Sequence, residues 1–186
     1  MYTNLRRRLR FFWYRTDKAI WVFVLFVGAI IATLGFALQA VVAFKEDRQN
    51  RARAMHTHNL TCLARNVYFE ARGEPVAGQY AVAEVTMNRK ASRLFPRTVC
   101  EVVYQQTWDP IRRRYVAAFS WTEFSVLPTP GGDEWQRAWR VAENVYYQKY
   151  TPQLQGALFF HATYVRPEWA KNKRRIARIG RHVFYK

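Results

Sequence analysis

The sequence predicts a mostly α, mixed α+β fold, in which one N-terminal transmembrane helix precedes a helical domain with a small β element. The chain has 186 residues, enough for one domain of ordinary size with an appendage. An apolar run without a charged side chain extends from Ala19 to Phe44. Beyond residue 60, apolar positions recur mostly at helical spacing, and β-type residues gather only near the C-terminus.

Residues 1–18 are interpreted as a basic cytoplasmic tail, because six Arg and Lys residues face a single acidic one, Asp17. The aromatic and basic side chains of this tail suit an anionic lipid surface, and we expect no nucleic-acid partner. The formal net charge of the chain, +17, also indicates anionic surroundings such as phospholipid or acidic cell-wall polymer.

Residues 19–44 are predicted to form an uncleaved transmembrane signal anchor. From Ala19 to Leu38 only Thr33 is polar, and about twenty residues span a hydrocarbon core of about 30 Å. This run exceeds the apolar core of a cleaved signal peptide, which has about 7–15 residues. The basic N-terminal flank predicts a cytoplasmic N-terminus, with the remaining chain outside the inner membrane. Residues 45–59 are polar and are expected to form a linker or a helical extension of the anchor.

The segment LTCLARNVYFEARGEP, residues 60–75, predicts a helix that ends by presenting Glu70. One helical face carries Leu60, Leu63, Ala64, Val67 and Ala71. Glu70 lies at the margin of this face, near the negative end of the helix, so apolar surroundings and the helix dipole both disfavour its ionised form. Such a carboxylic acid stays protonated near neutral pH and can donate a proton. The alternative is a solvated Glu70 paired with Arg65 or Arg72.

The block NVYFEARGEP, followed by GQYAVAEVTMNR, resembles the opening motif of the SleB/CwlJ-type cell wall hydrolases, the spore cortex-lytic enzyme family. Four later segments recur in the same order in that family: FPRTVCEVVYQ, FSW, ALFFHA and IGRHVFY. The resemblance covers residues 60–186 and implies that they form a catalytic domain. It also implies that Glu70, the first Glu of E-A-R-G-E, is the catalytic residue. The second, Glu74, is interpreted as a structural residue paired with an arginine.

Further helices are expected after the Glu70 helix. A second helix is predicted from Pro75 to Arg89. Thr98 and Glu101 have the spacing of a capping box, so a short helix should run from Val99 to about Tyr104. Residues 108–130 show no clean period and are expected to form a cleft-lining loop region.

The last third of the chain is predicted to hold one more helix and the β element. Asp133 with Gln136 resembles an N-cap pair for a helix that Thr151 and Pro152 would end. Residues 157–161 suggest a short strand, and residues 176–185 a small hairpin around Gly180. Helices with a minor β element are typical of lysozyme-like folds.

The two cysteines, Cys62 and Cys100, belong to different predicted helices. In an oxidising compartment outside the inner membrane a bridge between them would stabilise the domain. Two buried free thiols are the alternative.

The resemblance favours peptidoglycan glycan-strand cleavage, of lytic transglycosylase or muramidase type, by a single Glu acid/base. It implies that no cofactor or metal is needed. A second carboxylate, if one takes part, would be Glu84, Asp109 or Glu123. Aromatic rings stack on sugars and polar tips orient hydroxyls, so the candidate substrate-binding residues are Tyr68, Phe119, Ser120, Trp121, Phe160 and His161. The same residues are equally compatible with a core.

Two other functions are considered. A zinc-dependent N-acetylmuramoyl-L-alanine amidase would gather His161, His182 and Glu70 around a metal. The two histidines lie 21 positions apart in the sequence and lack the spacing of a helical metal-binding pair. A non-catalytic envelope protein would bind anionic polymer through its basic surface.

Overall fold

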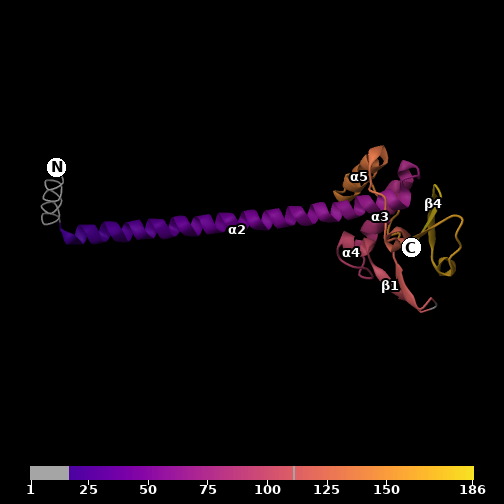
Figure 1. The fold of residues 1–186 in the computed structure, drawn as a ribbon, viewed down its shortest axis with the longest axis horizontal. Helices are drawn as coiled ribbons and strands as arrows, with labels where there is room; N and C mark the ends of the chain where they lie inside the picture. The colour runs from indigo at the N-terminus through magenta and orange to yellow at the C-terminus, as the bar shows by residue number, and fades with distance from the viewer. Residues whose placement is uncertain (1–16, 111) are drawn as a thin grey trace. The chain divides into compact units, whose positions relative to one another are not determined.

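In the computed structural model, residues 17–110 and 112–186 are described (Figure 1). The basic tail predicted for residues 1–18 therefore lies almost wholly outside the described residues. The helices are α2 (Lys18–Ala71), α3 (Val76–Ala91), α4 (Val99–Val103) and α5 (Gly132–Tyr146), with the 3-10 helices η1 (Ser120–Glu123) and η2 (Glu168–Asn172). The strands are β1 (Gln106–Asp109), β2 (Arg114–Ala117), β3 (Phe159–Ala162), β4 (Arg175–Ile179) and β5 (His182–Tyr185). The predicted fold class, mostly helical with a small β element, is confirmed.

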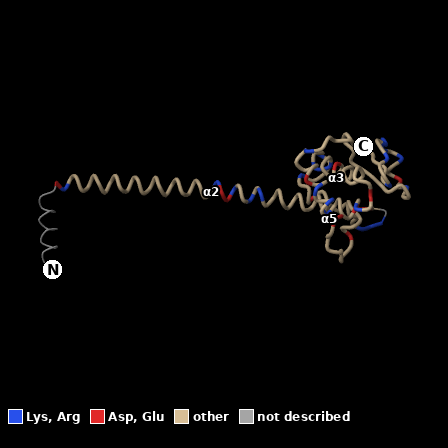
Figure 2. The backbone as a smooth tube through the Cα atoms, turned by 90° about the horizontal axis from the view of Figure 1, so that it is seen from above, with Lys and Arg blue, Asp and Glu red and all other residues tan. Residues whose placement is uncertain are grey.

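α2 is a single helix of 54 residues, so residues 45–59 form the helical extension that the sequence allowed. The chain separates into two compact units, one reaching to Arg53 and the other running from Ala54 to Lys186. In the first unit, the apolar side chains between Ile20 and Phe44 are nearly all exposed. Figure 2 shows this stretch without charged residues, followed by a band of mixed charge. Within the described residues, α2 alone has the length and composition to cross a membrane.

The core of the second unit forms where the last turns of α2 meet α3, α4 and α5. Leu63, Ala64 and Val67 of α2 are fully buried, as the helical face predicted from the sequence requires. α3 packs against both α4 and α5. Burial of these apolar faces, rather than helix propensity, supplies most of the stability of such short helices.

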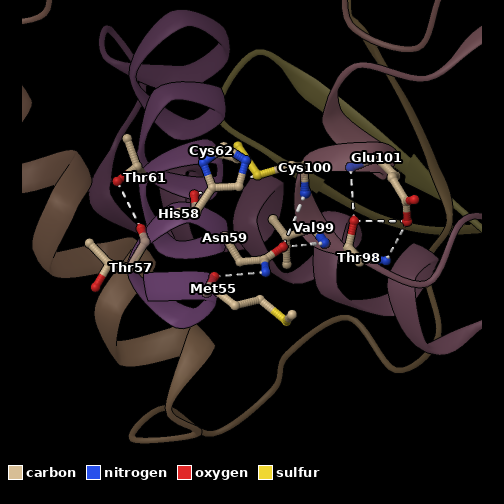
Figure 3. Close-up of a disulfide and its surroundings, with 10 residues drawn as sticks. All are labelled: Met55, Thr57, His58, Asn59, Thr61, Cys62, Thr98, Val99, Cys100 and Glu101. Carbon is tan, nitrogen blue, oxygen red and sulfur yellow. Dashed lines mark hydrogen bonds between the residues drawn. A yellow bond between two sulfur atoms is a disulfide. The ribbon is translucent and has the colours of Figure 1, made fainter. Parts of the chain in front are cut away.

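Hydrogen bonds to the Asn59 side chain and a disulfide fasten α4 to α2 (Figure 3). Thr98 and Glu101 form the predicted capping box at the start of α4. The side-chain oxygen of Asn59 accepts hydrogen bonds from the backbone N–H groups of Val99 at 2.9 Å and Cys100 at 3.3 Å. One turn further along α2, Cys62 is joined to Cys100 by a disulfide across a sequence separation of 38.

A three-stranded antiparallel sheet, in the order β3-β5-β4, closes the second unit near the C-terminus. The hairpin predicted around Gly180 is present as β4 and β5. Gly180 has φ +57°, and a Cβ at this position would overlap the Glu74 carboxylate, so the turn needs a glycine.

Three side chains of α3 hold the backbone that leads into β3. Both carboxylate oxygens of Glu84 accept backbone N–H groups, from Leu154 at 2.7 Å and from its neighbour in the chain at 2.9 Å. The Asn88 amide donates to two carbonyl oxygens of the same segment at 3.2 Å. The Arg89 Nε donates to the Leu158 carbonyl oxygen at 2.7 Å. Residues 153–158 therefore follow α3 closely without regular structure of their own.

Three local predictions are wrong. The region from Trp108 to Pro130 is not simply a loop, because β1 and β2 form an antiparallel hairpin there and η1 follows. Asp133 does not cap α5: Gly131 is the N-cap, without a side-chain hydrogen bond, and Asp133 lies inside the first turn. α5 also ends at Tyr146, earlier than Thr151 and Pro152 suggested.

Candidate active site

Glu70 lies in the last turn of α2, one residue before the helix ends. Its side chain is half-buried beside the core. Burial raises the pKa of Glu70 to about 7, and the positive charge of Arg89 opposes this rise. Within the described residues no hydrogen bond or ion pair engages the Glu70 carboxyl. This group is therefore poised to exchange a proton near neutral pH, and no hydrogen-bond or ion-pair partner among residues 17–110 and 112–186 competes for it.

Arg89 is a candidate functional residue that the sequence did not single out. It lies on α3, is only 7% exposed, and shares an electrostatic interaction with Glu70. Burial lowers the pKa of Arg89 to about 10, and the Glu70 carboxylate opposes this effect. Its guanidinium lies over the rings of Phe95 and Phe119, at 5.3 Å and 5.0 Å from their centroids. A signal was present, because Arg89 continues the apolar face of Val82 and Val85 at helical spacing.

The carboxylates proposed as second catalytic groups all have partners. Glu84 is buried and both its oxygens hold the backbone of the 153–154 turn. Asp109 pairs with Arg112 at 3.1 Å. Glu123 accepts hydrogen bonds from the Ala117 N–H and from Arg114, which lower its pKa. These contacts give each of the three a structural role. Glu70 differs from them, because it has no hydrogen-bond or ion-pair partner in the described part of the chain and only the charge of Arg89 acts on it.

Glu74 also has a structural environment. The backbone N–H of Arg181 donates to one oxygen at 2.8 Å and the Arg181 Nε donates to the other at 2.7 Å. Burial favours the neutral carboxyl, but these hydrogen bonds and the nearby charges prevail and lower the pKa of Glu74. His182 lies 4.0 Å from the same carboxylate and is itself buried. The arginine partner inferred from the sequence is thus Arg181, at the turn between β4 and β5.

Of the six candidate substrate-binding residues, three are buried in the core: Tyr68, Phe119 and Trp121. The Trp121 ring stacks on Phe69 at a centroid distance of 4.7 Å, and its Nε1 donates to the Asn66 side-chain oxygen at 2.9 Å. These three residues are therefore packing residues of the core. Ser120, at the start of η1, is exposed.

Phe160 and His161 are neighbours in β3, so their side chains point to opposite faces of the sheet. Phe160 lies toward the core, 6.2 Å from Phe119, which in turn lies under Arg89. His161 lies on the other face, where it stacks on Tyr185 at 5.3 Å. The structure therefore connects Phe160 with the Glu70 and Arg89 region and places His161 on the other face.

The histidines also have partners that do not suit the amidase arrangement of His161, His182 and Glu70. His161 Nδ1 donates to the Ala162 carbonyl oxygen and its Nε2 accepts from the Tyr185 hydroxyl, both at 2.9 Å. The one group of three side chains with metal-ligand spacing in the described ranges is His58, Cys62 and Cys100. Its two sulfur atoms are already joined in the disulfide.

Comparison with known families matches residues 73–185 to the family described as Cell Wall Hydrolase. The chain belongs to the cell wall hydrolase family. The match covers more than half of the chain and begins just after Glu70. It confirms the family that the E-A-R-G-E block and the later segments indicated.

Curated relatives of this cell wall hydrolase are spore cortex-lytic enzymes. The one from Bacillus subtilis is 29% identical over 138 residues, which are 73% of this chain and 40% of that enzyme. The one from Halalkalibacterium halodurans is 32% identical over 139 residues, 75% of this chain and 38% of the enzyme. The chain thus spans about two fifths of the length of these relatives.

Two solved structures resemble the second unit of this cell wall hydrolase in fold. The catalytic domain of the germination-specific lytic transglycosylase SleB from Bacillus anthracis has a TM-score of 0.53 and 29% identity. The alignment covers 69% of this chain and 93% of that domain. The catalytic domain of the Bacillus cereus SleB protein gives the same score and identity, over 70% and 91%.

Proposed function

We propose that this cell wall hydrolase cleaves peptidoglycan glycan strands as a lytic transglycosylase, with Glu70 as its single acid and base. The observation that carries the proposal is the state of the Glu70 carboxyl, half-buried, with a pKa of about 7 and without a partner among the described residues. The likeness to the catalytic domain of a lytic transglycosylase supports the same conclusion.

The reaction needs one proton donor that becomes a proton acceptor. The protonated Glu70 gives its proton to the glycosidic oxygen, the bond from that oxygen to C1 of the muramyl residue breaks, and the leaving sugar keeps the proton as a hydroxyl. The muramyl C6 hydroxyl then attacks C1, and the Glu70 carboxylate accepts the hydroxyl proton. The 1,6-anhydro product forms without water, and the acid is restored. Because the C6 hydroxyl is already held close to C1, the reaction needs no separate nucleophile.

Arg89 supports the step between the two proton transfers. At that moment Glu70 is ionised in a half-buried site, and a nearby guanidinium stabilises the carboxylate by charge. The same charge keeps the pKa of Glu70 from rising beyond the range in which the carboxylate can be regenerated. A single residue acts well as both acid and base when its pKa lies near the working pH.

We also propose that α2 anchors the enzyme in the inner membrane, with the N-terminus in the cytoplasm and residues 60–186 outside it. The exposed apolar stretch of α2 and the basic residues of the N-terminal flank support this orientation. The peptidoglycan substrate lies on that outer side of the membrane.

Product masses after digestion of purified peptidoglycan by the full chain in detergent micelles test the proposed activity. The wild type should release strands with 1,6-anhydromuramyl ends. The Glu70→Gln variant should fold normally and lose about 10²–10⁴-fold in rate, because the amide keeps the shape but cannot deliver a proton. Glu74→Gln is the matched control and should retain activity in proportion to its folded fraction.

Other products would identify other functions. Reducing muramyl ends would show hydrolysis of the muramidase type, and free peptides would show amidase activity. An absence of products from well-folded wild type would favour a non-catalytic envelope protein. Near-full cleavage by Glu70→Gln together with complete loss in Glu84→Gln would contradict the assignment of the acid.

A further inference from the structure

A recess lies beside α2, outside the group of residues around Glu70 and Arg89. It has a volume of about 370 Å³ and is lined by Thr61 and Arg65 of α2, Trp135 of α5, and residues 127–130, Leu-Pro-Thr-Pro. Its walls are therefore mostly apolar, with one charged side chain. The proline positions fix much of the backbone of residues 127–130, so little ordering is needed when a ligand binds.

Arg65 is the charged group of this recess. Its Nε is buried and has no hydrogen-bond partner, although a guanidinium cannot lose its charge in a protein. None of the ion pairs between described residues includes Arg65, and its guanidinium lies over the Trp121 ring at 5.8 Å. A buried donor without an acceptor is unfavourable, so this position suits a ligand that brings an acceptor.

We propose that the Arg65 recess binds the stem peptide that hangs from the glycan strand, by pairing Arg65 with a peptide carboxylate. Carboxylates pair with guanidinium groups through charge-assisted hydrogen bonds, often in a two-point arrangement. The apolar walls formed by Trp135 and residues 127–130 suit the methyl groups and aliphatic chains of such a peptide. This inference rests on the proposed function, since it concerns another part of the same substrate.

The position of Arg65 along α2 fits this assignment. Arg65 and Glu70 are five residues apart in one helix, which separates them by about 7.5 Å along the axis and about 140° around it. The stem peptide is attached to the muramyl residue whose glycosidic bond is cleaved. Arg65 and Glu70 are thus close along the axis but on different faces of α2, and binding of the peptide at Arg65 would fix the register of the strand on the enzyme.

Direct binding tests the inference without relying on catalysis. A synthetic stem tetrapeptide is titrated calorimetrically into the full chain in detergent micelles, together with the same peptide whose carboxyl groups are amidated. Arg65→Gln should weaken binding of the free acid by about tenfold to a hundredfold, the range for a charged hydrogen bond. Amidation of the peptide should weaken its binding to the wild type by the same factor and leave its binding to Arg65→Gln unchanged. Arg137→Gln, an exposed charge change on α5, is the matched control.

Kinetics then place the site in the reaction. On intact strands Arg65→Gln should raise the apparent KM and leave kcat nearly unchanged, whereas strands stripped of peptides by an amidase should show no difference from wild type. Equal binding of free and amidated peptide, or competition by inorganic phosphate at similar strength, would overturn the inference. If the wild type binds the peptide through Arg65 but cleaves neither substrate, the proposed function fails and the peptide site stands.

Discussion

The Glu74 carboxylate accepts two hydrogen bonds from Arg181, one from the backbone N–H at 2.8 Å and one from Nε at 2.7 Å, although 107 positions separate the two residues. This contact fastens the turn before α3 to the β4–β5 hairpin. Glu74 is buried, whereas the Arg181 side chain is largely exposed, so the carboxylate depends more on the contact than the guanidinium does.

Replacement of Glu74 should therefore reduce stability rather than chemistry. We expect Glu74→Gln to lower the free energy of unfolding by about 1–3 kcal/mol, the usual cost of a disrupted buried hydrogen bond. Because the folded-state pKa of Glu74 is lowered, its stabilisation is present above the unfolded pKa and is lost as pH falls through the folded value. Urea unfolding of wild type and Glu74→Gln at neutral and acidic pH measures both effects. An equal loss of unfolding free energy in Glu74→Gln at both pH values would contradict this account.

The activity of the wild type should fall as pH rises through about 7. The donor is the protonated Glu70, whose pKa is raised to about 7 by burial, so the donor form is depleted above that value. A profile of initial rate against pH on purified peptidoglycan measures the falling limb. A limb near pH 4.5, the ordinary range of a glutamic acid, would show that burial does not control this group.

Removal of the Arg89 charge should move the same limb to higher pH. In Arg89→Met the positive charge that lowers the pKa of Glu70 is absent, so the carboxyl stays protonated longer and the carboxylate intermediate is less stable. We expect a lower kcat with a falling limb above that of the wild type.

Arg89→Lys keeps the charge and serves as the control for the Arg89 experiment. Its falling limb should stay close to that of the wild type, although lysine cannot reproduce the hydrogen bond from Nε to the Leu158 carbonyl oxygen. Loss of activity in Arg89→Met without a displaced limb would mean that Arg89 acts through packing alone.

The disulfide between Cys62 and Cys100 should stabilise the second unit by about 2–5 kcal/mol. The double variant Cys62→Ser, Cys100→Ser should lose that amount in urea unfolding under oxidising conditions. With reductant present, wild type and double variant should unfold alike. Non-reducing mass analysis of the exported protein should show no free thiol, and two free thiols would disprove the bridge in the cell.

The proposed orientation of α2 is tested with a reporter enzyme fused after Lys186. A reporter that is active only outside the cytoplasm should give signal, because the basic N-terminal flank keeps that end inside. Replacing the arginines of residues 6–10 with glutamine should weaken this bias. Signal only from a cytoplasm-specific reporter would reverse the topology.

Local patterns predicted the local structure well. The apolar face of Leu63 and Val67 and the capping box of Thr98 and Glu101 each lie within one or two turns, so their spacing alone reveals them. The β1–β2 hairpin escaped because its connection contains no glycine signal. Arg113 takes the left-handed conformation there, at φ +51°, a position usually given to glycine or asparagine.

The features of the candidate site that the sequence did not predict depend on contacts between residues that are far apart in the chain. The resemblance singled out Glu70, but nothing near it in the sequence indicated that Arg89, 19 positions later, would share its surroundings. An aromatic residue looks the same in the sequence whether it faces a sugar or the core. Only the packing of the folded chain shows that Tyr68, Phe119 and Trp121 belong to the core. The sequence analysis places His161 beside Phe160 among the substrate-binding candidates. Because successive residues of a strand point to opposite faces, the two side chains lie on different sides of the sheet.

The hydrogen bond from Arg89 to Leu158 gives the sheet an influence over the acidity of Glu70. Arg89 is fixed at one end to the backbone that enters β3, while its charge acts on the carboxyl at the end of α2. The acidity of Glu70 thus depends in part on how the backbone that enters β3 holds the side chain of Arg89.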